Sequence, residues 1–375
     1  MDLAVIALCA RPLVASAARA GLSPLSLDLF ANLDTCAKAA RCVRVHRSNG
    51  AFDGDDLIAA LTNLGPAGLP VVLGGGLEDD PALMERIAAR NPILGNGPAT
   101  VRVLKDPLAL AALCGALRIP FPDVSLNAPD AAFAARPALE KKIGGCGGGH
   151  IRRRAAGDLA PPPDGFFLQQ EVSGDIYSLL MLTNGTEVRT IGACRQWHAP
   201  DDTHPYRYGG MVGPVALPAR HASAIEAAAR DIALACGLVG LVSVDLVIGA
   251  DRWWLVEVTP RLSAILDILD ADPLPPLLTA HLAACGGQMP GPLPMPKEHR
   301  ACAVLYATAE VIIPDGQWPS ATADRPAPGT VVKAGAPICT VHAAGTAPAA
   351  AEDQLTRRFI EVREWLGLEA VELAG

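Results

Sequence analysis

The 375-residue chain lacks the features that would place it in a membrane or metal-cluster class. No apolar run approaches the length of a transmembrane helix, and the apolar start carries Asp2 in place of a basic segment and soon meets Arg11. We therefore expect a buried first strand, with no signal peptide and no membrane partner. The ten cysteines form no CxxC pair, which argues against a zinc cluster or a disulfide framework and indicates reduced thiols in a cytoplasmic protein.

Basic residues are also in short supply. Lysine and arginine total 31 against 39 acidic residues, and the net charge of −8 argues against nucleic acid as the main partner. Only six of these residues are lysines, so each lysine in this chain calls for a specific explanation. The rest of the composition, 50% hydrophobic and 19% charged, is typical of an ordered globular protein, and the length allows two or three domains.

The first 98 residues alternate apolar strand patterns with helical patterns, beginning LAVIALCA, LVASAARAG and PLSLDLF. This alternation predicts a parallel α/β sheet of Rossmann type. The glycines of LGGGLED close a strand at the end where such sheets bind ligands, but they do not form GxGxxG, so a dinucleotide site is only weakly indicated. Later patterns predict helices over 106–117, 219–236 and 351–366, a Gly/Tyr-rich loop at 204–215 and small β structure at 300–345.

The segment SVDLVIGADRWWLVEVTPRLS predicts a β-hairpin around a GADR turn. If Ile248 pairs with Trp254, then Asp245 lies directly opposite Glu257. Opposed carboxylates repel each other unless a shared proton or a cation such as Mg²⁺ lies between them, or unless both point into water from a sheet edge. Because side chains alternate along a strand, one predicted face is apolar, with Val242, Val244, Leu246, Ile248, Trp254, Val256 and Val258. The other face offers oxygen ligands from Ser243, Asp245, Glu257 and Thr259.

A second group of functional candidates surrounds a glycine-rich segment, KKIGGCGGGH. Backbone N–H groups without side chains can close around phosphate oxygens, although consecutive glycines can also form a flexible surface turn. The segment lacks GKS/T and is not a Walker loop. Lys141 and Lys142 end the preceding strand on alternate faces, so one of them can reach a phosphate. Since lysines are rare here, their position favours phosphate binding.

The order of these features resembles the ATP-grasp superfamily of carboxylate ligases. Lys105 precedes a helix, Lys141 precedes the glycine loop, and FFLQQEVSG and VDLVIGADRWWLVEVTPRL follow. The resemblance implies an α/β fold with an α+β grasp. The units it implies are a Rossmann-like domain at 1–98, a two-lobed grasp domain at 99–285 and a small β-rich domain with a terminal helix at 297–375. Within the grasp domain it implies a lid lobe at 99–165, a hinge at 166–174 and a metal-binding lobe at 175–285.

The resemblance also implies roles for individual residues. Lys105 and Lys141 would bind ATP phosphates, and Arg261 would bind the reacting carboxylate or its acyl phosphate, so that Lys141 and Arg261 are the catalytic candidates. The glycine loop and the hinge would supply the other ATP contacts, through Gly147, Gly148, Gln169, Gln170, Glu171 and Val172. One or two Mg²⁺ ions, for which Mn²⁺ can substitute, would be held by Asp245, Glu257 and Thr259. The last of these departs from the family, which usually has asparagine there.

The implied activity is ATP-dependent joining of a carboxylate to an amine, with release of ADP and phosphate. The start of the chain, with LGGGLED and ILGN, is similar to a subgroup that includes the tyramine–glutamate ligases of methanofuran-type coenzyme synthesis. An amino acid such as glutamate is then the expected donor and a small amine the acceptor. A homo-oligomer is compatible with the sequence. Candidate substrate residues on loops that should face the site are Arg11, Gly75, Glu78, Tyr208 and Arg261.

Two other functions stay open at this point. A carboxylase-type subunit acting on bicarbonate would explain VVKAGAPICTV, which is similar to the small β domains of such enzymes and to biotinyl folds. The segment lacks the Met-Lys pair of a biotinylated turn, so Lys333 is interpreted as a structural residue. A non-catalytic nucleotide-binding protein is the other alternative, because Thr259 departs from the family pattern.

Overall fold

The computed structural model describes residues 1–48 and 50–368. It begins with a four-stranded parallel sheet in the order β3-β2-β1-β6. Alternate residues of β1 enter two different apolar cores, so both faces of this sheet are covered, and the predicted parallel α/β unit is confirmed. Its elements are β1 (Leu3–Ile6), α1 (Arg11–Arg19), β2 (Pro24–Asp28), α2 (Leu33–Cys36), β3 (Arg41–Arg44), β4 (Arg47–Ser48), β5 (Ala51–Phe52), α3 (Gly54–Leu64), β6 (Val71–Leu73) and α4 (Pro81–Ala88).

A second, antiparallel sheet of order β7-β10-β8-β9 follows two short helices. The predicted helix near residue 106 is confirmed, because the Asp106 side chain accepts hydrogen bonds from the N–H groups of Leu108 and Ala109 and Pro107 opens its first turn. The elements here are α5 (Pro98–Lys105), α6 (Pro107–Leu117), β7 (Val124–Ser125), α7 (Ala131–Ala134), β8 (Ala138–Lys142), β9 (Arg152–Arg154) and β10 (Phe166–Gln170).

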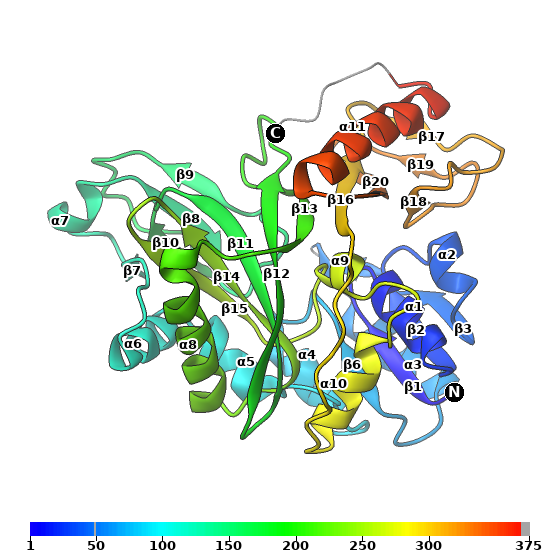
Figure 1. The fold of residues 1–375 in the computed structure, drawn as a ribbon, viewed down its shortest axis with the longest axis horizontal. Helices are drawn as coiled ribbons and strands as arrows, with labels where there is room; N and C mark the ends of the chain where they lie inside the picture. Colours follow the sequence, from blue (N-terminus) through cyan, green and yellow to red (C-terminus); the bar gives the residue numbers. More distant parts are fainter. Residues whose placement is uncertain (49, 369–375) are drawn as a thin grey trace.

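The largest sheet has eight strands in the order β15-β14-β11-β12-β13-β16-β20-β18. Helix α8 packs on one face, α10 packs on the other face near the N-terminal sheet, and α11 covers the C-terminal strands (Figure 1). Its strands are β11 (Asp175–Asn184), β12 (Val188–His198), β13 (Tyr208–Val215), β14 (Val239–Ile248), β15 (Trp253–Thr259), β16 (His299–Tyr306), β18 (Thr322–Ala323) and β20 (Pro337–Gly345). The helices are α8 (Ala219–Ala235), α9 (Leu266–Leu269), α10 (Leu277–Cys285) and α11 (Pro348–Trp365).

The C-terminal segment continues this sheet. Strand β16 pairs with β13, so the strands after residue 297 extend the sheet that carries the acidic hairpin. A separate two-stranded sheet joins β17 (Val311–Ile312) to β19 (Val331–Val332). The last seven residues of the unit expected at 297–375 lie outside the described residues.

The loop predicted at 204–215 is wrong for most of its length. Its last two thirds, Tyr208–Val215, form strand β13, which pairs on one side with β12 and on the other with β16. A side chain at Gly210 would lie 2.2 Å from the Cys302 carbonyl oxygen and 2.6 Å from the Trp197 ring. The glycines that suggested a loop therefore allow close approach of neighbouring strands.

The hairpin forms as predicted around its acids but not near its turn. Asp245 pairs with Glu257, whereas Ile248 pairs with Trp253 and not with Trp254, because a β-bulge follows Asp245. The bulge turns the predicted core residues Trp254 and Val256 away from the core, and Trp253 and Leu255 are buried in their place, whereas Val258 is buried as predicted.

The cysteine prediction is wrong for one pair. Cys36 and Cys42 form a disulfide across the short connection between α2 and β3. The structure brings them together because Cys36 ends the helix and Cys42 lies in the strand that immediately follows. No helix in 1–48 or 50–368 is both long enough and apolar enough to cross a membrane.

Candidate active site

Two carboxylates lie side by side at the edge of the large sheet. Asp245 on β14 pairs with Glu257 on β15. The Asp245 carboxylate accepts hydrogen bonds from the Ser178 hydroxyl and, at 3.3 Å, from the Gln196 side chain. Burial and the neighbouring Glu257 raise the pKa of the Asp245 carboxyl. The hairpin thus presents a concentrated negative charge to the space beside it.

Two lysines lie close to these carboxylates, one at the end of a helix and the other in the antiparallel sheet. Lys105, at the end of α5, is only 9% exposed, and its Nζ lies 2.5 Å from Glu257 Oε1. Burial alone would raise the pKa of Glu257, but the ammonium groups of Lys105 and Lys141 outweigh burial and lower it. Lys141 at the end of β8 donates a hydrogen bond of 3.3 Å to Gln169 Oε1, and burial lowers its pKa. The acids and lysines therefore form one electrostatic unit.

A cavity joins these groups between the antiparallel sheet and the hairpin. It contains the polar ends of the two lysines and Glu257, and apolar side chains close its inner wall. Such a combination of an apolar wall and convergent charges is typical of a small-molecule site. Its lining residues are Leu104, Lys105, Pro107, Leu110, Phe121, Lys141, Lys142, Gly144, Gly145, His150, Phe167, Gln169, Val256 and Glu257.

Residues 144–149 form a glycine loop that closes over this cavity. The Gly147 carbonyl accepts a hydrogen bond of 2.9 Å from Tyr208 N–H, and a side chain at Gly148 would lie 2.0 Å from the Tyr206 carbonyl oxygen. On its other side, a side chain at Gly144 would lie 2.5 Å from the Glu78 carbonyl oxygen. The loop needs glycine at these contacts because other segments approach its backbone closely.

The hinge residues are only partly directed at the cavity. Gln169 lines it, whereas the buried Gln170 donates a hydrogen bond of 2.9 Å to the Phe133 carbonyl. Glu171 accepts hydrogen bonds from the Arg153 guanidinium at 2.7 Å and the Tyr206 hydroxyl at 3.1 Å. Val172 follows directly after these residues and is half-buried.

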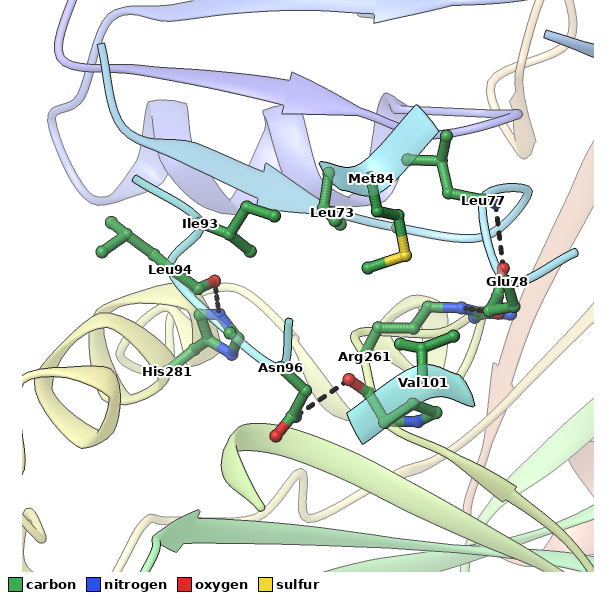
Figure 2. Close-up of a pocket in the computed structure, with 13 residues that line it drawn as sticks. Leu73, Leu77, Glu78, Met84, Ile93, Leu94, Asn96, Val101, Arg261 and His281 are labelled. Atoms are coloured by element: carbon green, nitrogen blue, oxygen red, sulfur yellow. Dashed lines mark hydrogen bonds and ion pairs between the residues drawn. The ribbon is translucent and has the colours of Figure 1, made fainter. Parts of the chain in front are cut away.

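Arg261 lies beyond the hairpin, at a second cavity. Its Nε donates a hydrogen bond of 2.6 Å to Glu78 Oε1 (Figure 2). The absence of a side chain at Gly75 leaves space for the guanidinium. Burial opposes ionisation of Glu78, but Arg261 and Lys105 lower its pKa to about 2. Three of the five predicted substrate residues, Gly75, Glu78 and Arg261, are therefore adjacent.

The other two predicted substrate residues lie elsewhere. Arg11 binds both Asp267, at 2.8 Å through Nη2, and Asp324, at 2.8 Å through Nε. Tyr208 is half-buried at the start of β13, with its hydroxyl 3.9 Å from the Cys302 sulfur. Arg11 has a structural role in this geometry, since both of its partners come from distant segments of the chain.

Sequence reasoning missed the two partners of Asp245. Ser178 lies on β11 directly beside Asp245 in the sheet, and Gln196 lies on β12 and donates a hydrogen bond of 2.5 Å to the Ser178 hydroxyl. Only the strand order β14-β11-β12 brings them together. No local pattern in the sequence marks either residue.

The acidic hairpin is suited to a hard divalent cation. Asp245, Glu257 and the Thr259 hydroxyl are oxygen ligands, which Mg²⁺ prefers, and two adjacent carboxylates in a desolvated site are costly unless positive charge balances both of them. Across 1–48 and 50–368, no group of three or more His, Cys, Asp or Glu residues could hold a metal. Such a cation would take the rest of its ligands from phosphate oxygens and water, as Mg²⁺ does in nucleotide sites.

Comparison with known proteins places part of the chain in a known domain family. Residues 108–265 match the model of an ATP-grasp domain, and no curated protein matches the sequence. The biotin carboxylase domain of *Hydrogenobacter thermophilus* 2-oxoglutarate carboxylase, solved with MgADP, ADP and bicarbonate, is 11% identical with a TM-score of 0.73, over 95% of this chain and 89% of that one. Biotin carboxylase of *Campylobacter jejuni* is 13% identical with a TM-score of 0.72, over 96% and 91%.

A longer protein shares the same fold. *Rhizobium etli* pyruvate carboxylase is 14% identical with a TM-score of 0.74, over 96% of this chain but only 37% of that one. At such identities the likeness concerns the fold alone. Together with the family match, it shows that residues 108–265 carry an ATP-grasp domain and that the chain has the mixed α and β ATP-grasp fold.

Proposed function

We propose that this protein is an ATP-dependent ligase that activates a carboxylate as an acyl phosphate and joins it to an amine. The observation that carries the proposal is the meeting of Lys105 and Lys141 with Glu257 at one cavity beside the glycine loop, with Asp245 paired to Glu257 on the neighbouring strand. Two cations, two adjacent carboxylates and a close-packed loop are the groups that phosphoryl transfer needs for positioning and charge stabilisation.

The nucleotide would lie in this cavity. Its phosphates would contact Lys105 and Lys141 beneath Gly147 and Gly148, and its adenine would lie along the hinge formed by Gln169, Gln170, Glu171 and Val172. The cation site is proposed at Asp245, Glu257 and Thr259. Bound Mg²⁺ would supply neutralisation of the phosphate charge. The lysines then hold the phosphates in line with the carboxylate, and the glycine loop excludes water that would hydrolyse the acyl phosphate.

Arg261 is proposed to hold the carboxylate. A carboxylate oxygen attacks the γ-phosphorus of ATP, the bond to the leaving ADP oxygen breaks, and an acyl phosphate forms. The amine nitrogen then attacks the acyl carbon and loses a proton, and phosphate leaves. Arg261 is suited to this position because its guanidinium stays charged and its Nη2, which has no hydrogen-bond acceptor within 1–48 and 50–368, can donate to a carboxylate.

The resemblance to tyramine–glutamate ligases supports an amino acid such as glutamate as donor and a small amine as acceptor. It also supports a role in the synthesis of a methanofuran-type coenzyme in the cytoplasm. The second candidate function is a carboxylase-type subunit that phosphorylates bicarbonate. Its support is the likeness to biotin carboxylase domains, which extends through the C-terminal strands to 95% of the chain.

The proposal is tested by measuring ADP release with pairs of amino acids and amines, and by mass spectrometry of the product. Release that depends on both an amino acid and an amine supports the ligase, and release that depends on bicarbonate supports the carboxylase. No release with any acid would leave only nucleotide binding.

Glu257→Gln tests the cation site within the same assay. We expect turnover to fall at least a hundredfold, because the variant removes a proposed Mg²⁺ ligand and leaves Lys105 without its carboxylate partner. The matched control is Asp251→Asn, which removes an exposed acid from the turn of the same hairpin and should leave turnover unchanged. Normal activity in Glu257→Gln would contradict the metal assignment.

A further inference from the structure

The ion pair between Glu78 and Arg261 is buried, and the Glu78 carboxylate accepts three hydrogen bonds, which leaves one of its roughly four acceptor positions open. Glu78 is 4% exposed, and its Oε2 accepts hydrogen bonds from the N–H groups of Gly76, at 2.8 Å, and Leu77, at 3.1 Å. Its Oε1 takes the Arg261 Nε–H. Since its pKa is lowered to about 2, Glu78 is an anion at neutral pH.

Arg261 keeps hydrogen-bonding capacity beyond this pair. Its Nε binds Glu78, and its Nη1 donates a hydrogen bond of 3.1 Å to the Leu262 carbonyl. Within 1–48 and 50–368, Nη2 meets no hydrogen-bond acceptor, and its near neighbour is the bare backbone of Gly75. A carboxylate can therefore approach the guanidinium on its Nη2 side.

A narrow cavity opens beside the pair, and its wall is apolar (Figure 2). The polar side chains in the wall are occupied by the protein itself. Asn96 binds the carbonyls of Val239 and Pro260, and His281 binds the Leu94 carbonyl and the Leu241 N–H. What remains for a ligand is hydrocarbon surface from Leu73, Leu77, Met84, Ile93, Leu94 and Val101.

Charge balance limits which acids can use Arg261. A simple carboxylate bound at Nη2 would place a second negative charge beside the buried anion of Glu78, and an uncompensated buried charge is strongly destabilising. A zwitterion avoids this cost, because its ammonium group compensates Glu78 while its carboxylate binds Arg261. The ion pair therefore discriminates between an amino acid and an acid without an ammonium group.

We propose that the donor is an α-amino acid with a short apolar side chain, with its carboxylate on Arg261, its ammonium group on Glu78 and its side chain in the narrow cavity. This inference rests on the proposed ligase function, keeps an amino acid as the donor, and replaces glutamate, the example given there, with small aliphatic amino acids. A second carboxylate has no cationic partner among the apolar side chains of the cavity wall.

The test measures ATP-dependent hydroxamate formation, with hydroxylamine as the amine that captures the acyl phosphate. The acids are L-2-aminobutyrate, butyrate, L-glutamate and bicarbonate. We expect kcat/KM for L-2-aminobutyrate to exceed those for butyrate and glutamate at least tenfold. Butyrate differs only by lacking the ammonium group, so it isolates the role of Glu78.

Two variants separate the charged pair from the cavity. Glu78→Gln should lower kcat/KM for L-2-aminobutyrate at least tenfold and have much less effect on butyrate. Met84→Ala widens the cavity away from the charges, and it should shift preference from L-2-aminobutyrate towards L-leucine. Correct folding of each variant is checked by thermal unfolding.

The outcomes separate this inference from the proposed function. Equal use of butyrate, or preference for glutamate, overturns the inference and leaves the ligase intact. If no acid gives a hydroxamate, the ligase proposal fails. Calorimetric titration with L-2-aminobutyrate then decides the inference alone: binding that Glu78→Gln abolishes supports it, and no binding overturns it.

Discussion

His281 is a buried histidine whose two ring nitrogens both bind the backbone. Nδ1 accepts a hydrogen bond of 2.9 Å from Leu241 N–H, and Nε2 lies 3.0 Å from the Leu94 carbonyl, which fixes a neutral ring with its proton on Nε2. Burial lowers the pKa of His281 from 6.5 to about 4. The unfolded chain therefore binds a proton between pH 6.5 and pH 4 that the folded chain does not.

This difference predicts a loss of stability in mild acid. As the pH falls from 7 to 5, His281 should lower the free energy of unfolding by about 2 kcal/mol, and its effect should level off below its folded-state pKa. Urea denaturation of the wild type and of His281→Gln at both pH values measures it, because other titrating groups cancel in the comparison. An equal pH dependence in the two proteins would contradict the assignment.

Some residues of the candidate site can be predicted from the sequence and others cannot. The opposition of Asp245 and Glu257 is predicted from a register that pairs Ile248 with Trp254, and it holds because the bulge after Asp245 offsets the one-residue error at the turn. The pairing of Arg261 with Glu78 does not, because it joins residues 183 positions apart through the packing of two separate sheets. Long-range partners of this kind leave no periodic signal.

The glycine loop connects β8 to β9 and holds two glycines in the same backbone conformation. Gly147 and Gly148 have φ of +70° and +71°, a region that costs other residues about 1–3 kcal/mol. Only Gly148 is also crowded, since a Cβ there would lie 2.0 Å from the Tyr206 carbonyl oxygen, whereas a Cβ at Gly147 meets nothing within 4 Å. Substitutions at Gly147 and Gly148 therefore distinguish the effect of backbone strain from the effect of steric contact.

Alanine substitutions at these two positions test loop closure. Gly148→Ala should raise the KM for ATP about tenfold or more, because the loop must move away from Tyr206 to admit the methyl group. Gly147→Ala carries the same backbone cost without the clash and should have a much smaller effect. The ATP dependence of ADP release measures both, and equal effects would show that the contact with Tyr206 is irrelevant to nucleotide binding.

Helices and strands that have strong periodicity or capping residues can be predicted from the sequence. Features that depend on the neighbouring strands of a sheet cannot. Helix α6 has its capping Asp106 and its proline, and it is found as predicted. The glycines of strand β13 predict a loop, whereas in the structure they allow β12 and β16 to approach closely. The bulge after Asp245 likewise has no local signature, although it reverses the side chains of the following residues.

At the scale of the whole molecule, Arg11 joins three distant parts of the chain. It lies at the start of α1, and its partners are Asp267 in α9 and Asp324 after β18. Asp324 also accepts a hydrogen bond of 2.6 Å from the Thr340 hydroxyl. Arg11 keeps Asp324 ionised. Burial alone would raise the pKa of Asp324, but the Arg11 guanidinium outweighs burial and lowers it to about 2.

Arg11→Met should therefore destabilise the protein as a whole. It leaves two buried carboxylates without their cation, and we expect the free energy of unfolding to fall by about 3–5 kcal/mol. The matched control is Arg136→Met, which breaks an exposed pair with Asp123 and should cost less than about 1 kcal/mol. Chemical denaturation compares the two, and similar losses would contradict a central role for Arg11.

The shared sheet has a consequence for how the protein can be divided. Strand β13 pairs along one edge with β16. A chain cut before residue 297 would therefore expose a row of unpaired N–H and C=O groups along β13. Bare strand edges recruit other chains and initiate aggregation. Shortened versions intended for crystallisation or fusion should keep β16 and β20 in place, and added tags belong beyond α11.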